Sequence, residues 1–106
     1  MLPRTERLRT KEVEVTIQLG RSARAGVLSL KYAPTPGHSR CAVVVSKKVA
    51  KKATDRNNLR RRVYAALERV VLPKNIAAVF FVQRIPPTPR VATFTQDILQ
   101  LCSNIS

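Results

Sequence analysis

A dense basic run leading into an amphipathic segment constrains the fold of this chain more than any other feature. Residues 47–62 contain eight lysines or arginines in sixteen positions, with Asp55 as the only acid. From Leu59, apolar residues recur at i, i+4, i+7, i+8 and i+11, which is one face of a helix. We therefore expect a helix here, with Thr54 or Asp55 as its N-cap and its end at Leu72, which precedes a proline.

The charge balance of the whole chain points to a polyanionic partner. The 106 residues allow one domain, expected to span 1–106, and they include 20 Lys+Arg against 6 Asp+Glu, for a net charge of +14. Self-repulsion of this size destabilises the isolated chain, so we expect it to be more stable when bound. Solubility alone does not require so one-sided a balance. Membrane binding is disfavoured, because no amphipathic stretch sets Trp or Phe opposite a basic face. Nucleic acid is the expected partner.

The cysteines and the N-terminal sequence favour a reducing, cytoplasmic location. Cys41 and Cys102 are far apart in sequence, the N-terminus lacks the apolar core of a signal peptide, and no stretch approaches the roughly 20 apolar residues of a membrane span. We expect both cysteines to act as small hydrophobes. With His38 as the only histidine, they are too few for the usual four-ligand zinc site.

The segment 9–19 is ambiguous on its periodicity. Apolar side chains alternate with polar ones from Val13 to Leu19, which is the period of a strand. Two glutamates and Gln18 equally permit a helix, so the residues leave both alternatives open. Gly20 is expected to end the element, as a helix C-cap does.

The remaining segments predict a two-layer α+β domain with helices packed on one small sheet. Short runs that are β-branched or that alternate apolar and polar residues predict strands, and a segment rich in Pro and Gly predicts a loop. Phe94, Ile98 and Leu101, spaced four and three residues apart, predict a final helix. The strand at 41–45 is expected to pair antiparallel with the strand before it, and the apolar run at 76–82 to be covered on both faces. The expected elements are strand 27–32, loop 33–39, strand 41–45, strand 76–82 and helix 91–101.

The chemistry in the sequence favours binding over catalysis. Arg60, Arg61 and Arg62 follow one another with no acid at i±4, and arginine forks match phosphate groups. The six carboxylates are scattered without paired spacing, so we expect no catalytic residue and no metal site of the protein's own.

Two central motifs resemble the bacterial ribonuclease P protein component. They are Val45-Ser46-Lys47-Lys48-Val49 and, after a short spacer, Arg56-Asn57-Asn58-Leu59-Arg60-Arg61. The opening Met1-Leu2-Pro3 with Arg7-Leu8-Arg9 is similar to the start of that family, and Val82-Gln83-Arg84 to the end of its last strand. The resemblance implies an α-β-β-β-α-β-α sandwich with a left-handed βαβ crossover, like the second domain of ribosomal protein S5. It also implies a first helix where the periodicity leans to strand.

The resemblance further implies a function in tRNA 5′ maturation. In that family the RNA subunit performs Mg²⁺-dependent hydrolysis, so Mg²⁺ is expected through the RNA and not on the protein alone. The expected partners are the catalytic RNA and precursor tRNA, with no obligate protein partner. In that family, a cleft between the first helix and the sheet holds the single-stranded leader, so we expect such a cleft here. Together with the adjacent Asn58 and Arg62, the residues expected to touch RNA are Lys47, Lys48, Lys51, Lys52, Arg56, Asn57, Arg60, Arg61, Arg7 and Arg9.

Several positions depart from the family pattern. Asn58 stands where the family has arginine, and Tyr64 stands where the family often has one. Tyr64 is expected either to stack on a base or to pack. Val13 and Ile17 replace aromatic residues of the leader cleft. Tyr32 is expected either to compensate for them or to pack in the core. The alternatives to the leading function are a ribosomal or other structural RNA-binding protein without a role in cleavage and, less favoured, a DNA-binding architectural protein.

Overall fold

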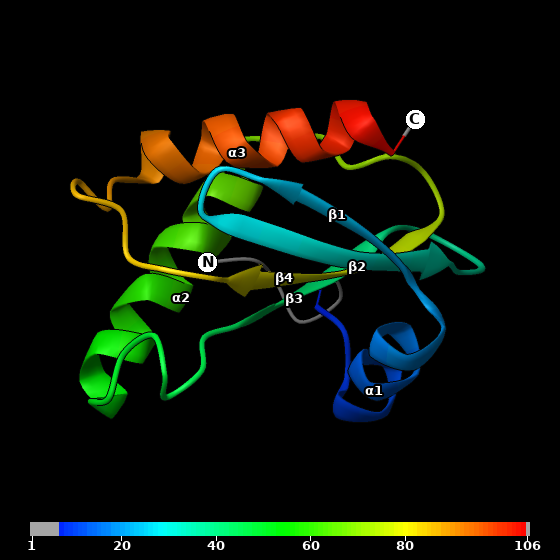
Figure 1. Cartoon of the computed structure of the whole chain (residues 1–106). Coiled ribbons are helices and arrows are strands. Elements are labelled where there is room, and N and C mark those ends of the chain that lie inside the picture. Colours follow the sequence, from blue (N-terminus) through cyan, green and yellow to red (C-terminus); the bar gives the residue numbers. More distant parts are fainter. Residues whose placement is uncertain (1–6, 106) are drawn as a thin grey trace.

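The structure, a computed structural model, describes residues 7–105 (Figure 1). The element order is α-β-β-β-α-β-α, which confirms the order implied by the family resemblance. It includes one strand that the residue pattern alone did not predict, because β1 is short, has no β-branched residue and is mostly exposed. The elements are α1 (Thr10–Leu19), β1 (Arg21–Ala25), β2 (Leu28–Pro34), β3 (Arg40–Val44), α2 (Ala53–Leu67), β4 (Ile76–Val82) and α3 (Val91–Asn104).

The four strands form one sheet in the order β1-β2-β4-β3. β2 is antiparallel to both β1 and β4, whereas β3 is parallel to β4. The predicted antiparallel pairing of β3 with β2 is therefore wrong: β4 lies between them. β4 is the most continuously apolar strand, and the central position buries both of its faces over most of its length. The β3-α2-β4 connection is a βαβ unit, and the left-handed sense of its crossover stays a prediction.

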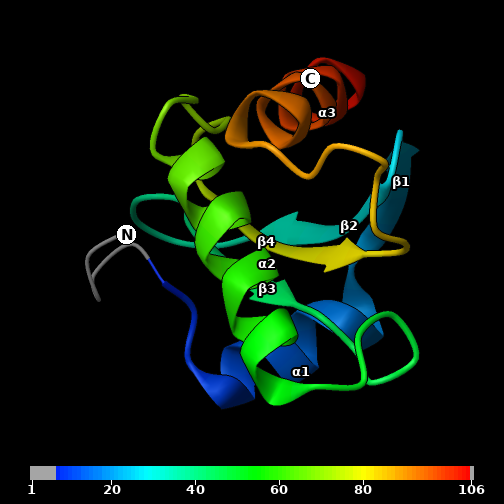
Figure 2. The same ribbon diagram turned by 90° about the vertical axis from the view of Figure 1, so that its left-hand side faces the viewer.

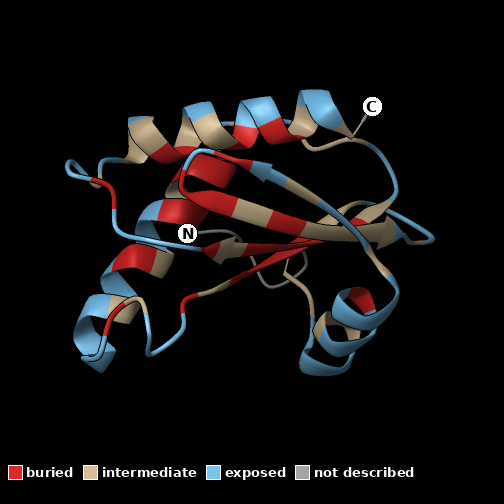
Figure 3. Cartoon of the chain, viewed as in Figure 1, coloured by how far each residue is buried: buried red, intermediate tan, exposed pale blue. Residues whose placement is uncertain are grey.

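The main core lies between the sheet and the pair α2 and α3. Figures 1 and 2 show α3 on one side of the sheet and α1 on the other. Side chains of β2 and β4 such as Leu30 and Phe80 pack in one buried cluster with Val63 of α2 and with Phe94 and Ile98 of α3. In Figure 3 the buried faces of α2 and α3 turn toward the sheet, whereas most of α1 is exposed.

α1 is a helix despite its alternating pattern. In a helix, Val13 and Ile17 share one side, while Val15 and Leu19 lie about half a turn away. Val15 and Leu19 are consequently 53% and 77% exposed, and Thr16 is the residue of α1 that is buried. Gly20 is the C-cap, as predicted, and donates its N–H to the Thr16 carbonyl at 2.8 Å.

Both predicted ends of α2 are wrong by several residues. The N-cap is Lys52, so Asp55 lies in the first helical turn, where its charge complements the helix dipole. The helix ends at Leu67, before the proline that was expected to stop it. The N–H of Val70 donates instead to the Leu67 carbonyl, which turns the chain so that Val70 and Leu72 pack against the core.

Candidate RNA interface

The outward face of α2 and the turn before it form an exposed basic surface. The lysines of the turn project into solvent, and the apolar stripe of the helix, which includes Leu59 and Val63, is buried against the sheet. Arg56 and Arg60 are half-buried. The predicted RNA-contact residues that are exposed on this surface are Lys47, Lys48, Lys51, Lys52, Asn57, Asn58, Arg61 and Arg62.

Arg56 fixes the turn that carries the lysines. Its Nη1 donates to the carbonyls of Ala50 and Lys51 at 3.0 and 2.8 Å. The Val49 and Ala50 amides donate to the Ser46 carbonyl at 3.1 and 3.2 Å, which closes the turn on its other side. Arg56 therefore positions neighbouring cations, a role that the motif alone did not reveal.

Asn57, Arg60 and Tyr64 lie along one side of α2, at helical spacings of three and four. Arg60 donates from Nη2 to the Asn57 side-chain oxygen. The remaining N–H groups of the guanidinium keep their donor capacity for a phosphate. The predicted pair of Arg and Asn thus acts as one preorganised unit on the surface of the helix.

The N-terminal segment runs along the free edge of β3. Arg7 forms a parallel bridge with Cys41, and the Leu8 amide donates to the Cys41 carbonyl at 2.9 Å. These contacts cover part of an edge strand that would otherwise expose unpaired groups. They also bring Arg7 next to α2. Arg7 and the basic residues of α2 can therefore bind the same RNA. The matching residues Met1-Leu2-Pro3 lie outside the described part of the chain.

Tyr64 lies where the N-terminal segment, β3 and α2 meet. Its hydroxyl accepts a hydrogen bond from the Val43 amide at 3.2 Å, and the guanidinium of Arg7 lies 5.7 Å from the ring centroid. The side chain is buried, and this burial raises the pKa of Tyr64 above its usual value. Of the two roles open for this residue, stacking on a base or packing, the structure shows packing.

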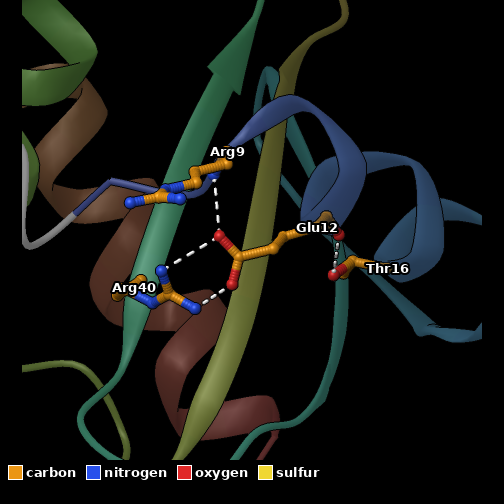
Figure 4. Close-up of polar contacts among 4 residues, drawn as sticks. All are labelled: Arg9, Glu12, Thr16 and Arg40. Carbon is orange, nitrogen blue, oxygen red and sulfur yellow. Dashed lines mark hydrogen bonds and ion pairs between the residues drawn. The ribbon is translucent and has the colours of Figure 1, made fainter.

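Glu12 joins the start of α1 to β3 (Figure 4). Its carboxylate accepts a hydrogen bond from the Arg9 amide at 3.0 Å and pairs with both terminal nitrogens of Arg40, one of them at 2.9 Å. The hydroxyl of Thr16 donates to the Glu12 carbonyl at 2.8 Å. Glu12 was not a predicted site residue, although a glutamate three residues after a helix start is a known capping signal.

The face of the sheet that α1 shares is partly open. A cavity of about 480 Å³ lies over β1, β2 and β4, lined by Arg24, Ser29, Lys31, Phe81 and Gln83 among others. Gln83 donates from Nε2 to the Ser29 hydroxyl at 2.6 Å. The family resemblance implied a cleft between the first helix and the sheet, but Arg24, Lys31 and Phe81, which line this cavity, were not predicted as site residues. The strand alternation, which puts Phe81 opposite the buried Phe80, is the signal that would have found it.

The three predicted leader-cleft residues do not form one surface. Val13 is half-buried on α1, and Ile17 is 37% exposed. Tyr32 pairs in register with Ala78 and packs against the main core. Of the two expectations for Tyr32, the structure thus shows core packing. Phe81 is the aromatic residue that lines the open face.

The described residues offer binding surfaces but no metal centre. Within residues 7–105, no group of three or more His, Cys, Asp or Glu side chains could hold a metal ion. In the same range, no helix has the length and apolar character needed to cross a membrane. The arrangement can bind phosphate groups through α2 and stack a base on the sheet.

Comparison with known proteins gives consistent matches. A family model described as Ribonuclease P matches residues 2–106. The ribonuclease P protein component of Thermus aquaticus is 43% identical over 58 residues, which are 55% of this chain and 35% of that protein. The alignment thus spans about a third of that relative's length. The ribonuclease P protein of Thermotoga maritima has a TM-score of 0.80 and 25% identity, over 95% of this chain and 98% of its own. The Staphylococcus aureus protein shares the fold, with a TM-score of 0.75 at 14% identity over 95% of each chain.

Proposed function

Because the chain belongs to the ribonuclease P protein family, we propose that it is the protein subunit of a ribonucleoprotein that removes the 5′ leader from precursor tRNA. Its partners are the catalytic RNA and the precursor tRNA. The Mg²⁺-dependent hydrolysis is assigned to the RNA, and the protein contributes binding and orientation. Cys41 and Cys102 form no disulfide within residues 7–105, which fits a reducing cytoplasm as the place of this activity.

The exposed basic face of α2 is the observation that carries this proposal. Arg61, Arg62 and four lysines of the preceding turn point away from the packed side of the helix, and Asp55 is the only acid among residues 47–62. A rigid helix that presents arginine forks recognises the RNA backbone at fixed spacing. We assign this face to the catalytic RNA.

The open face of the sheet is assigned to the single-stranded leader. Phe81 offers a ring for base stacking, and Arg24 and Lys31 line the same cavity and supply positive charge. Stacking against an aromatic ring tolerates any base, which suits a leader of variable sequence. The two RNA surfaces thus lie on different elements and are separable by mutation.

The test of the α2 assignment is the affinity of the protein for its RNA subunit. Arg60→Ala combined with Arg61→Ala removes two guanidinium groups, and each charge-assisted hydrogen bond contributes about 1.5–3 kcal/mol. We expect affinity to fall by at least roughly tenfold. Arg84→Ala combined with Arg90→Ala, which removes two exposed arginines outside the α2 face, is the charge-matched control. A folded double variant with unchanged affinity would remove the assignment.

A further inference from the structure

A groove beside α2 lies outside the two surfaces assigned above. It has a volume of about 1010 Å³ and opens between the N-terminal segment, the loop that follows β2, and α2. Its lining includes Arg7, Arg9, His38, Arg40 and Tyr64. The groove is wide and open enough for a polymer strand to lie in it, and its walls come from three separate parts of the chain.

The charge of the groove favours an anion. Among residues 7–105, no acidic side chain lines the groove. The positive charge of Arg40 is offset by its ion pair with Glu12 of α1. Arg7 and Arg9 therefore supply the net positive charge, and both belong to the segment that covers the edge of β3.

The groove continues the basic face of α2. Tyr64 follows Asn57 and Arg60 on the same side of the helix, and the rise of 1.5 Å per residue puts about 10 Å between the two ends of this row. Arg7 contacts Tyr64 at the groove end. A single RNA strand can therefore contact Arg60 and Arg7 at the same time.

We propose that Tyr64 is a positioning residue: it holds Arg7, already expected to touch RNA, in this groove, where the phosphodiester backbone of the catalytic RNA binds. The proposal rests on the proposed function and deepens it. The occupant is the RNA subunit, because the groove is continuous with the α2 face assigned to that RNA and separate from the open sheet face.

The geometry explains why a tyrosine performs this task. Its hydroxyl is hydrogen-bonded to the Val43 amide and its ring is buried, so the ring cannot rotate away. The backbone of Arg7 is fixed by its bridge to Cys41. The attraction between the guanidinium and the ring then restricts the flexible arginine side chain, and less entropy is lost when phosphate binds. Tyr64 itself touches no RNA.

A double-mutant cycle on RNA affinity tests both parts of the proposal. Arg7→Gln is expected to weaken binding of the RNA subunit about tenfold, as loss of one charge-assisted contact does. Tyr64→Leu, which keeps an apolar side chain but removes the ring, is expected to weaken it about two- to fivefold. In the double variant, the Tyr64→Leu effect is expected to disappear, because Arg7 is no longer there to be positioned.

Tyr64→Phe separates positioning from a structural role. It removes the hydrogen bond to Val43 but keeps the ring, so the coupling to Arg7 should persist in this variant. Equal coupling losses in Tyr64→Phe and Tyr64→Leu would show that the residue acts through β3 alone, which would overturn the positioning role. Arg90→Gln again serves as the charge-matched control, and denaturant unfolding establishes that each variant is folded.

Two outcomes would overturn the site while leaving the proposed function intact. One is an Arg7→Gln variant with unchanged affinity for the RNA subunit, while the Arg60 and Arg61 variant still binds weakly. The other is an Arg7→Gln variant that impairs only the binding of precursor tRNA to the assembled complex, because the occupant would then be the substrate. If neither set of arginines affects the RNA subunit, the proposed function itself fails.

Discussion

Single side chains tie the N-terminal segment, α1 and β3 together. Glu12 accepts hydrogen bonds from the Arg9 amide and the Arg40 side chain, and Tyr64 accepts one from Val43 while it contacts Arg7. Glu12 was not predicted to bind RNA, and for Tyr64 base stacking was one of two expectations. Glu12 holds the backbone of Arg9 and Tyr64 contacts the Arg7 side chain, so loss of either one is expected to affect function through the position of an RNA-contact arginine.

Glu12→Gln is expected to lower the free energy of unfolding by about 1–3 kcal/mol, the range for a hydrogen bond to a charged group in a partly buried site. The side chains of Arg40 and Glu12 are 23% and 31% exposed, so solvent screens the pair only in part. Urea denaturation measures the change. Glu14→Gln, at an exposed position of the same helix, is the matched control and should have little effect. Equal stability of the two variants would contradict a structural role for Glu12.

Tyr64 is expected to make stability fall at alkaline pH. Its pKa is raised in the folded protein, mainly because burial disfavours the phenolate. The folded state therefore holds the proton more tightly than the unfolded state, and stability is lost as pH rises above the usual tyrosine value of about 10. Above about pH 10, Tyr64→Phe should therefore lose less stability than the wild type in paired urea titrations. Parallel losses in both proteins would count against this prediction.

At the scale of elements, the sequence predicted what local periodicity determines. The spacing of Phe94, Ile98 and Leu101 predicted α3, and all three are buried; the apolar run predicted β4 with its observed bounds. The sequence-based prediction failed for features that depend on contacts between distant parts of the chain. The partner of β3 depends on β4, which lies more than thirty residues later, and the helical state of α1 depends on packing against β2 and β4.

The candidate site, too, has features that the local sequence predicts and features that only the tertiary fold determines. The basic face of α2 followed from the motif and the helical period. The contacts of Arg56 with its own turn, and of Arg7 with Tyr64, depend on which side chains the fold brings together. The lining of the open sheet face was missed for a related reason: a run of apolar residues does not reveal that Phe81 stays partly exposed.

The open sheet face predicts a leader-specific defect in Phe81→Ala. Loss of one stacking ring is expected to weaken binding of precursor tRNA by about 1–3 kcal/mol, provided that the leader is present. Affinity for mature tRNA and for the RNA subunit should not change. Leu99→Ala, which truncates a 53% exposed residue on α3, is the control. A defect of equal size with leader-free tRNA would show that Phe81 acts elsewhere.

For the whole molecule, the net charge of +14 makes salt act in opposite directions on folding and on binding. Salt screens self-repulsion, so the free energy of unfolding of the free protein should rise between about 0.05 and 0.5 M KCl. RNA affinity should fall over the same range, because bound phosphates release counterions. Urea denaturation and RNA titrations at each salt concentration measure the two effects. A free protein that is destabilised by KCl would indicate that internal ion pairs outweigh repulsion.

Precursor-tRNA cleavage by the cognate RNA subunit at low Mg²⁺, with and without this protein, tests the central claim most directly. We expect the protein to stimulate cleavage, and the stimulation to shrink when the 5′ leader is trimmed. Stimulation that does not depend on leader length would contradict leader binding by the open sheet face, but would be consistent with contact between the protein and the catalytic RNA. No stimulation, with both subunits folded and bound to each other, would contradict a function in tRNA maturation and favour a purely structural RNA-binding protein.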